Sequence, residues 1–472
     1  MERTTTDTTD VLIVGLGIAG VCAAIEARDA GAQVLALDWA GAGGGASALS
    51  SGILYLGGGT AVQEACGYAD DTDNMTAYML ASTPGTDPAV VQAFCEGSVE
   101  HFNWLEEQGV PFERTSVSGK NVILFTTECL FYTGNEKAWP WLDLARPAPR
   151  GHKVAGKGEH AGYAAMASLL QRCTDVGVRT RLNTKAVALL VEGDRVVGVR
   201  ASGPDGELEI RARRGVILAT GMFTYGTDLV AEHIPLISDS CRPLGIETND
   251  GNGLELAVTA GAALEAMDGM IATASIYPPE SLVRGIIVNS SGRRIVAEDA
   301  YHGRQAHFIA EQPDQTAFLL VDEANFGYPA NRAAGHKLLG VFESIPEAAS
   351  AMGVDPTDLE QTLRQYNTDA AAGHDDLFHK QPEWLCPLNP PLAVFDISFN
   401  KSMYLFTTLG GITSDADGRA LREDGSAVPG LYAVGACAAH LTKSGKTYAS
   451  GMSLGPGSFF GRRAGRHAAT TN

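Results

Sequence analysis

The sequence has no paired cysteines, no long apolar run and no leader-like start. Its eight cysteines are spread from Cys22 to Cys437 without a C-x-x-C pair, which argues against a zinc ribbon or a dithiol redox centre and favours a reducing compartment. No stretch approaches the roughly 18 apolar residues of a membrane-spanning helix, and residues 1–10 are polar and threonine-rich. We therefore expect a cytoplasmic protein without a membrane span.

Positive charge is also scarce. The chain has 35 Lys and Arg against 55 Asp and Glu, a formal net charge of −20 at pH 7. This sign repels phosphate backbones, so nucleic acid is not an expected partner. His302, His307 and His440 lack the spacing of metal ligands, and we expect no metal site.

Glycine, by contrast, is abundant. The chain has 472 residues, of which 45% are hydrophobic, and this length corresponds to two or three domains with a sizeable core. Its 55 glycines gather in short clusters beside apolar runs, where the backbone must turn sharply or let a ligand approach closely. We therefore expect ligand sites lined by backbone.

The first forty residues have the order of a dinucleotide-binding unit. An apolar strand at 11–14 runs into the G-x-G-x-x-G sequence of 15–20, and a helical pattern follows at 21–30. A second strand at 33–37 ends at Asp38, an acid that would accept hydrogen bonds from the ribose hydroxyls. The pattern predicts a pyrophosphate at the helix N-terminus. The alternative is a glycine-rich turn in an ordinary α/β unit.

The next segment indicates a flavin dinucleotide. Residues 41–52 are almost all glycine, alanine and serine, and they are too many for the second crossover of an NAD domain. Small residues let the chain pass beside a pyrophosphate and a flavin ring, while Ser47, Ser50 and Ser51 can donate hydroxyl protons. A disordered glycine linker is the alternative, but an apolar strand-like run resumes at 53–56.

Later segments predict more of the same fold and an insertion within it. Residues 181–200 alternate as two strands around a turn at Gly193-Asp194, and the strand-like runs at 215–221 and 429–435 end at glycine. The cofactor site is therefore predicted to draw on both ends of the chain. From residue 269 the pattern changes to short strands and a helix; the predicted elements are strands at 285–289 and 316–321 and a helix at 356–372. We predict an α/β fold in which a second, α+β domain is inserted.

In order along nearly the whole chain, several motifs resemble the FAD-dependent fumarate reductase and 3-ketosteroid dehydrogenase superfamily. They are Gly15, Gly17 and Gly20 with Asp38; 43–47; Ala219-Thr220-Gly221; 249–253; 289–294; and Gly410-Gly411-Ile412. The resemblance implies a Rossmann-like FAD-binding domain with an inserted capping domain. The implied division is 1–268 and 394–472 for the FAD-binding domain and 269–393 for the capping domain.

The resemblance also implies the cofactor contacts. Covalent members attach the flavin through a histidine in the glycine-serine segment; none lies between Trp39 and Thr60, so non-covalent FAD is expected. Two departures are Ala436, where many relatives have an acid, and Met222, where a second glycine is usual. The expected contacts are Gly15, Gly17, Ile18, Ala19, Gly20, Asp38, Trp39, Gly44, Gly45, Ala46, Ser47, Ser50, Ser51, Gly52, Ala186, Val187, Ala219, Thr220, Gly221, Asp250, Gly435, Ala436, Gly451, Ser453 and Leu454.

The C-terminal motif favours one branch of the superfamily. Fumarate reductases hold a dicarboxylate with an arginine in this motif, and Tyr448 stands at that position here. A phenol suits a ketone rather than a carboxylate. Δ1-dehydrogenases typically have Tyr-Pro-Gly-Pro-Gly, whereas Tyr448-Ala449-Ser450-Gly451 is similar to the 3-ketosteroid Δ4-(5α)-dehydrogenases, which use two tyrosines and a serine. The second tyrosine maps onto Tyr301.

The implied reaction introduces a C4=C5 bond beside a C3 ketone. It removes a proton from C4 and transfers a hydride from C5 to the flavin N5. We assign the proton to Ser450 aided by Tyr301, with Tyr448 supporting the relay or donating to the ketone and backbone N–H groups near Gly451 holding the enolate oxygen. Tyrosines are more often amphipathic core residues, which is the alternative for Tyr301 and Tyr448.

Other functions remain open from the sequence. They are a 3-ketosteroid Δ1-dehydrogenase, a flavin-dependent enoate reductase, and a flavin-binding protein without catalysis, which Ala436 would fit. The absence of a C-x-x-C-H haem motif for electron delivery argues against the reductase. The sequence does not identify the electron acceptor. Arg293 and Arg294 are interpreted as a surface pair. Five aromatic residues could line a steroid pocket or an ordinary core: Phe125, Phe131, Tyr132, Trp139 and Trp141.

Overall fold

A largely parallel sheet, built from strands at both ends of the chain, organises the larger lobe. The computed structural model describes residues 5–122, 124–156, 158 and 161–471. The strands are β1 (Thr5–Val14), β2 (Val34–Leu37), β6 (Arg179–Arg181), β7 (Lys185–Glu192), β8 (Arg195–Gly203), β9 (Gly206–Leu218), β19 (Arg419–Leu421) and β20 (Ala427–Ala433). Their order is β19-β20-β9-β1-β2-β6, with the β7–β8 hairpin joined to β9. Pairs among β20, β9, β1, β2 and β6 are parallel, and the apolar parts of β1 and β2 are buried, as expected for strands covered on both faces.

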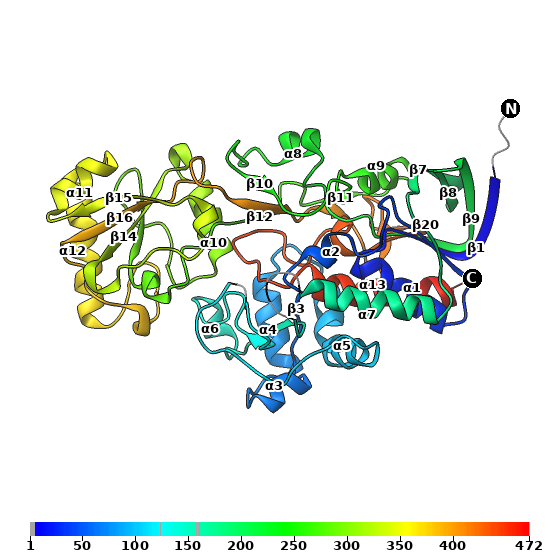
Figure 1. The fold of residues 1–472 in the computed structure, drawn as a ribbon, viewed down its shortest axis with the longest axis horizontal. Coiled ribbons are helices and arrows are strands. Elements are labelled where there is room, and N and C mark those ends of the chain that lie inside the picture. The colour runs from blue at the N-terminus through cyan, green and yellow to red at the C-terminus, as the bar shows by residue number, and fades with distance from the viewer. Residues whose placement is uncertain (1–4, 123, 157, 159–160, 472) are drawn as a thin grey trace.

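Three helices pack together beside this sheet (Figure 1). They are α1 (Ile18–Asp29), α7 (Gly162–Asp175) and α13 (Leu454–Thr470). A Cβ atom at Gly461 or Gly465 of α13 would lie 2.2 Å from a backbone oxygen of α1, at Ala19 and Ala23 respectively. The two glycines therefore allow the first and last helices of the chain to approach backbone to backbone.

A helical subdomain lies below the sheet in Figure 1. It contains α3 (Ala61–Ala65), α4 (Thr72–Ser82), α5 (Pro88–Glu107), α6 (Trp141–Leu144) and the small sheet of β3 (Ile53–Tyr55), β5 (Gly151–Lys153) and β4 (Leu130–Phe131). The short helix α2 (Gly45–Leu49) lies outside this subdomain and packs on α7. The Asp87 side chain accepts a hydrogen bond from the Ala89 N–H and caps α5. This capping explains why the longest helix of the subdomain begins at Pro88.

Short strands connect the two lobes. β10 (Arg242–Pro243), β17 (Leu405–Thr408) and β12 (Met270–Thr273) form one sheet, and β11 (Leu264–Glu265) pairs with β18 (Gly411–Ile412). The helices here are α8 (Thr227–His233), α9 (Asn252–Thr259) and α10 (His302–Ala310). Since β17 follows the inserted segment and β12 precedes its sheet, the two connections to the second lobe lie side by side.

The second lobe has its own antiparallel sheet and its own apolar cluster. Its strands, in the order β13-β14-β16-β15, are β13 (Ile286–Asn289), β14 (Ala317–Asp322), β16 (Leu392–Asp396) and β15 (Lys337–Phe342). α11 (Ile345–Met352) and α12 (Pro356–Ala372) cover it at the far end from β1 (Figure 1). The short 3-10 helices of this lobe are η1 (Glu280–Arg284), η2 (Pro313–Gln315), η3 (Glu323–Asn325), η4 (Arg332–Ala334) and η5 (Pro382–Trp384), whereas η6 (Gly435–Cys437) follows β20 in the larger lobe and packs on α13. Leu359 and Leu363 of α12 pack against Ile286 and Val394 in this separate cluster.

The predicted α/β fold with an inserted α+β unit is confirmed. In the described ranges, no helix has both the length and the apolarity to cross a membrane. The same residues contain no group of three or more His, Cys, Asp or Glu side chains arranged to hold a metal ion.

Candidate active site

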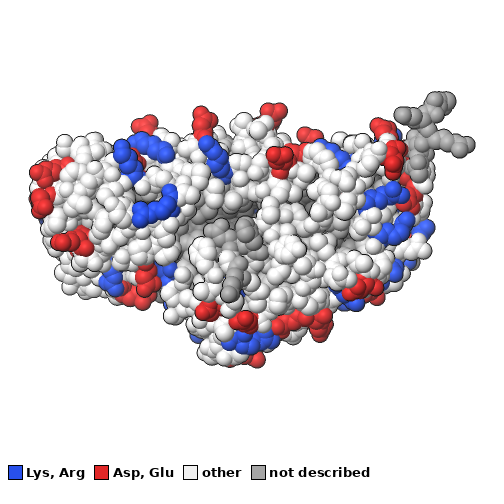
Figure 2. All heavy atoms as spheres, viewed as in Figure 1, with Lys and Arg blue, Asp and Glu red and all other residues white. Residues whose placement is uncertain are grey.

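A cavity of about 920 Å³ lies where the two lobes meet. Its wall combines the glycine turn after β1 and residues 219–222 after β9 with Tyr277, Pro278 and residues 330–333 of the second lobe. Figure 2 shows the molecule hollowed near the middle of this face, with most charged side chains toward the periphery. The cavity is thus placed to hold a cofactor on one lobe against a substrate on the other.

The glycine turn brings backbone, rather than side chains, to the cavity wall. Gly15 has φ +107°, and a Cβ atom there would lie 2.3 Å from the Ala219 carbonyl oxygen. Gly17 is the N-cap of α1 and provides no side-chain cap, so the positive end of the helix dipole lies at the cavity. Ser47 accepts the Ile18 N–H at 3.1 Å. This arrangement suits a pyrophosphate.

Substitution of Gly15 by alanine tests this turn. We expect Gly15→Ala to weaken FAD binding about 100-fold, because the backbone strain and the clash with Ala219 together cost about 3 kcal/mol. The measurement is fluorescence titration of the apoprotein with FAD. Gly206→Ala is the matched control, since Gly206 has φ +102° and open space around its Cβ position. Equal affinity of the two variants for FAD would contradict the assignment.

Asp38 also lies at the cavity wall. Its carboxylate accepts the N–H groups of Leu16 and Ala40, both at 2.8 Å, while burial raises its pKa. The next residue, Trp39, lies under the Lys185 ammonium at 3.6 Å from the ring centre, and Lys185 pairs with Asp250 at 3.1 Å. One oxygen lone pair of each Asp38 carboxylate oxygen remains for ribose hydroxyls, as expected at the adenosine end of a dinucleotide.

Most of the predicted cofactor residues line this one cavity. They are Gly15, Gly17, Ile18, Ala19, Asp38, Trp39, Gly45, Ala46, Ser47, Ser50, Ser51, Ala186, Ala219, Thr220, Gly221, Asp250, Gly435, Ala436, Gly451, Ser453 and Leu454. Small side chains, a helix N-terminus and the available volume fit a flavin dinucleotide.

Four predicted contacts do not line the cavity. Gly20 lies against the Gly15 carbonyl, where a Cβ would come within 2.0 Å of the oxygen, and a Cβ at Gly52 would lie 2.5 Å from the Gly162 backbone nitrogen. Gly44 precedes α2 and donates its N–H to the Leu16 carbonyl. Val187 is 42% exposed on the face of β7 opposite to Ala186, as strand alternation requires. The three glycines serve backbone packing around the site.

The three predicted catalytic side chains meet at the cavity although they come from both lobes. Tyr301 is the N-cap of α10, and its hydroxyl lies 2.9 Å from the Ser450 Oγ. The Tyr448 ring is 6.4 Å from the Tyr301 ring, and its hydroxyl lies 3.1 Å from the Ser453 Oγ. The Ser450 N–H donates to the Thr133 carbonyl, which fixes the motif against the helical subdomain. This constellation can bind a ketone and exchange a proton.

Burial keeps the hydroxyl groups of the two tyrosines protonated. It raises the pKa of Tyr301 well above 10, with the neighbouring Tyr448 adding to the effect, and it raises the pKa of Tyr448 as well. Burial also lowers the pKa of His302 to about 3; the His302 ring centre lies 4.1 Å from that of Tyr301. A proton can therefore pass along these hydroxyls, and His302 stays neutral near pH 7.

Comparison with known proteins places the chain in a family. The family described as FAD binding domain matches residues 10–451. The chain belongs to the FAD binding domain family. It is an FAD-dependent oxidoreductase, and the resemblance noted in the sequence is confirmed.

Three relatives illustrate the similarity. The chain is 28% identical over 498 residues to a 3-oxo-5-alpha-steroid 4-dehydrogenase of Comamonas testosteroni, covering 91% of this chain and 92% of that one. It is 26% identical over 476 residues to a probable fumarate reductase of Shewanella frigidimarina, covering 98% and 75%. The crystal structure of 3-ketosteroid-delta4-(5alpha)-dehydrogenase from Rhodococcus jostii RHA1, in complex with 4-androstene-3,17-dione, matches with a TM-score of 0.93 and 38% identity over 100% and 99% of the two chains.

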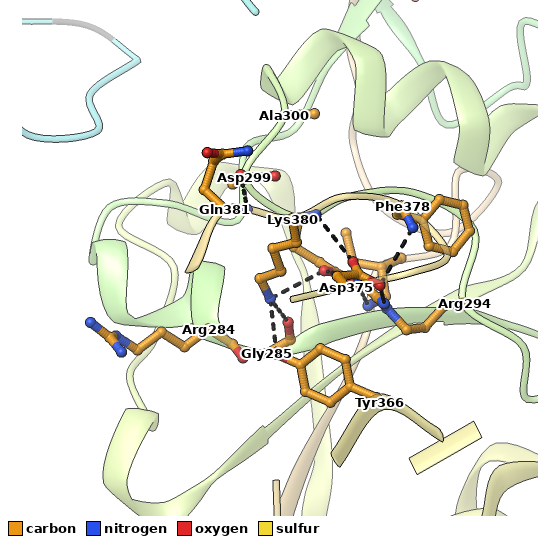
Figure 3. Close-up of polar contacts among 12 residues, drawn as sticks. Arg284, Gly285, Arg294, Asp299, Ala300, Tyr366, Asp375, Phe378, Lys380 and Gln381 are labelled. Atoms are coloured by element: carbon orange, nitrogen blue, oxygen red, sulfur yellow. Dashed lines mark hydrogen bonds and ion pairs between the residues drawn. The ribbon is translucent and has the colours of Figure 1, made fainter. Parts of the chain in front are cut away.

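In this family member a buried ion cluster holds the segment that carries Tyr301. Glu298 receives Arg294 at 2.8 Å and Lys380 at 3.1 Å, and Arg294 also pairs with Asp375 at 2.9 Å. Figure 3 shows Arg294, Lys380 and Asp375 converging from separate segments. The interpretation of Arg294 as a surface residue was wrong, because its side chain is 3% exposed and pairs with Glu298, four residues further on, and with the distant Asp375.

Several cavity residues were not predicted. Lys185, Asn249, Ile271, Tyr277 and Pro278 line the cavity beside the expected groups. Asn249 lies in the 249–253 motif, which could have indicated it. No sequence motif indicated Tyr277 and Pro278, because only the fold brings β12 and the residues that follow it next to the flavin-binding lobe.

The aromatic residues divide between pocket and core. Phe125 lines the cavity and is 64% exposed. Phe131 and Trp141 are buried in the helical subdomain, and Trp139 packs on His379 with ring centres 4.4 Å apart. Of the five aromatic residues considered, only Phe125 lines the cavity, so the core interpretation was the better one for Phe131 and Trp141.

Proposed function

We propose that the protein dehydrogenates a 3-ketosteroid and introduces a double bond between C4 and C5. The hydrogen-bonded pair of Tyr301 and Ser450, facing the cavity that also contains the glycine turn, carries this proposal. It is supported by the similarity to the Rhodococcus jostii enzyme, whose structure holds 4-androstene-3,17-dione. FAD, bound without a covalent link, supplies the acceptor for the two electrons of the oxidation.

The chain's own groups handle the proton and the ketone. Ser450 takes the C4 proton as it passes its own hydroxyl proton to the Tyr301 oxygen, and the Tyr301 hydroxyl releases its proton toward solvent, so that one proton leaves for each one removed from C4. The Gly451 N–H lines the cavity and donates to no acceptor among the described residues, which leaves it to hold the developing enolate oxygen. Tyr448 completes the wall beside this oxygen.

The rest of the cavity suits an apolar ring system. Leu244, Ile246, Ile271, Leu405 and Pro278 supply apolar surface from the connecting strands and the second lobe. A dicarboxylate would instead need guanidinium donors at the reacting end. Tyr448 in the arginine position therefore favours a ketone over fumarate, and a Δ1-dehydrogenase is the second candidate because it acts on the same substrate class.

We also propose the division into domains at 1–268, 269–393 and 394–472. The four-stranded sheet and its apolar cluster draw all their strands from 286–396, which supports an inserted capping domain. The last strand, β16, ends at Asp396 and so overlaps the proposed boundary by three residues. The paired strands β12 and β17 connect this domain to the FAD-binding domain.

Anaerobic mixing of the purified yellow protein with a saturated 5α-3-ketosteroid tests the function. We expect the visible absorbance of the oxidised flavin to bleach at about one equivalent of steroid. The product, identified by mass spectrometry, should be a 4-ene-3-ketone. A 1-ene product would assign the Δ1 reaction instead. No bleaching by the steroid, together with reoxidation of reduced enzyme by an enoate, would contradict the proposal and favour a reductase.

A further inference from the structure

One loop of the helical subdomain contacts both Ser450 and Tyr301 from behind the cavity wall. The loop comprises residues 133–136, between β4 and α6, and none of these four residues lines the cavity. The Thr133 carbonyl oxygen accepts the Ser450 N–H at 2.9 Å. The Asn135 Oδ1 accepts the Tyr301 N–H at 3.0 Å. Two residues that are 149 positions apart in the chain are thus held by one short segment.

The loop is itself fixed on both sides of Asn135. The Asn135 N–H donates to the Tyr78 hydroxyl of α4 at 3.2 Å, and the Asn135 carbonyl oxygen accepts the Ala138 N–H at 2.8 Å. Tyr78 and Asn135 are each 1% exposed. A Cβ atom at Gly134 would lie 2.7 Å from that of Ala449, so the loop packs directly on the C-terminal motif. The Asn135 side chain therefore extends from a main chain that cannot easily shift.

Asn135 also completes the fixation of the Tyr301 main chain. The Tyr301 carbonyl oxygen accepts the N–H groups of Arg304 and Gln305 at 2.9 and 3.2 Å, which binds it to the first turn of α10. The N–H of this N-cap residue has no partner within the helix, and Asn135 supplies one. With both main-chain groups bound, the direction of the Tyr301 side chain is set, and its hydroxyl lies 2.9 Å from the Ser450 Oγ.

We propose that Asn135 is a positioning residue that holds the Tyr301 hydroxyl at hydrogen-bonding distance from Ser450. This inference rests on the proposed function, in which the Tyr301 oxygen accepts the Ser450 hydroxyl proton as Ser450 takes the proton from C4. Asn135 acts through the Tyr301 main chain and does not line the cavity. Because Thr133 of the same loop binds the Ser450 N–H, one segment sets the separation of the two hydroxyl oxygens.

Two substitutions of Asn135 separate its acceptor from its size. A backbone N–H needs an acceptor, so Oδ1 rather than Nδ2 must face Tyr301. Aspartate keeps an oxygen at that position, whereas leucine is of similar size and has none. We expect Asn135→Leu to lower the rate of flavin reduction by the steroid on the order of 10- to 100-fold, with the steroid Kd changed less than about threefold. Asn135→Asp is expected to stay within about fivefold of wild type.

A double-mutant cycle tests whether Asn135 acts through Tyr301. In a Tyr301→Phe background, Asn135→Leu should cost less than about threefold, because the hydroxyl that it positions is already missing. If leucine prevents folding, Asn135→Ala takes its place with the same expected outcomes. Asn367→Leu is the matched control, since it removes an Oδ1 that accepts the Leu388 N–H at 2.8 Å away from the cavity, and the rate should not change. Equal losses in both backgrounds, or equal losses in Asn135→Leu and Asn135→Asp, would overturn the proposal.

Hydrogen exchange of the Tyr301 N–H gives a readout independent of turnover. In FAD-loaded protein labelled with nitrogen-15 in tyrosine, its NMR signal is assigned through its loss in Tyr301→Phe. We expect this N–H to exchange about tenfold faster in Asn135→Leu than in wild type, and at an unchanged rate in Asn135→Asp. Equal exchange in wild type and Asn135→Leu would overturn the proposal even if a steroid is oxidised. If no steroid reduces the flavin but the exchange follows this order, the proposed function fails while the contact between Asn135 and Tyr301 stands.

Discussion

Removal of the Tyr301 hydroxyl, in Tyr301→Phe, is expected to slow steroid-dependent flavin reduction about 1,000-fold. Phenylalanine keeps the ring that packs beside His302 and Tyr448, so the cavity retains its shape. What disappears is the partner of Ser450 at 2.9 Å, and with it the oxygen that accepts the Ser450 hydroxyl proton as Ser450 takes the one from C4. Stopped-flow absorbance under anaerobic conditions measures this rate, and the steroid Kd should change little.

The pair should behave as one unit. Ser450→Ala is expected to cause a similar loss, and the double variant should be scarcely slower than either single one, because each removal disables the same proton transfer. Tyr163→Phe is the matched control, since Tyr163 is 68% exposed on α7 and does not line the cavity. A Tyr301→Phe enzyme that keeps a third of the wild-type rate would exclude Tyr301 from the proton transfer.

Elements whose determinants are local could be predicted from the sequence. The strand predicted at 33–37 is β2, and the helix predicted at 356–372 coincides with α12, where Asp355 caps one end and Gly373 the other. The helix predicted from residue 21 begins at Ile18, inside the glycine motif, because Gly17 serves as its N-cap. Apolar period, capping residues and glycine turns all act within a few residues of the element they define.

The site could be predicted only in part, because its partners are distant in the chain. Ser450 and Tyr301 are separated by 149 positions, and no periodicity indicates that they meet; the resemblance to a known superfamily indicated them. Lys380 and Arg294 look like surface charges until the fold places both on Glu298. Such contacts depend on the order in which strands pair in the fold, and no local sequence pattern encodes that order.

Glu298→Gln is expected to destabilise the second lobe by about 3 kcal/mol, because it leaves two buried cations with one carboxylate. Since Glu298 is three residues before Tyr301, flavin reduction should slow as well. The measurement is urea unfolding of the FAD-loaded protein, monitored by fluorescence. The quantity compared between the variants is the free energy of the transition in which the second lobe unfolds. Glu360→Gln is the control: it breaks the exposed pair with Arg364 and should change stability by no more than about 0.5 kcal/mol.

Charge balance makes this prediction specific. The cluster contains two cations, Arg294 and Lys380, and two anions, Glu298 and Asp375, so removing Lys380 as well in Glu298→Gln/Lys380→Met restores neutrality. That double variant should be more stable than Glu298→Gln alone, and if it is not, uncompensated charge is not the cause of the destabilisation.

The same cluster predicts a pH dependence of stability. Burial opposes ionisation of Glu298, but the arginine and lysine beside it outweigh this effect and hold its pKa below the usual 4.5. The stabilisation from its charge is therefore complete above the usual pKa and is lost as the pH falls through the lower, folded-state pKa. The difference in stability between wild type and Glu298→Gln should stay constant from about pH 6 to 7 and shrink below about pH 4.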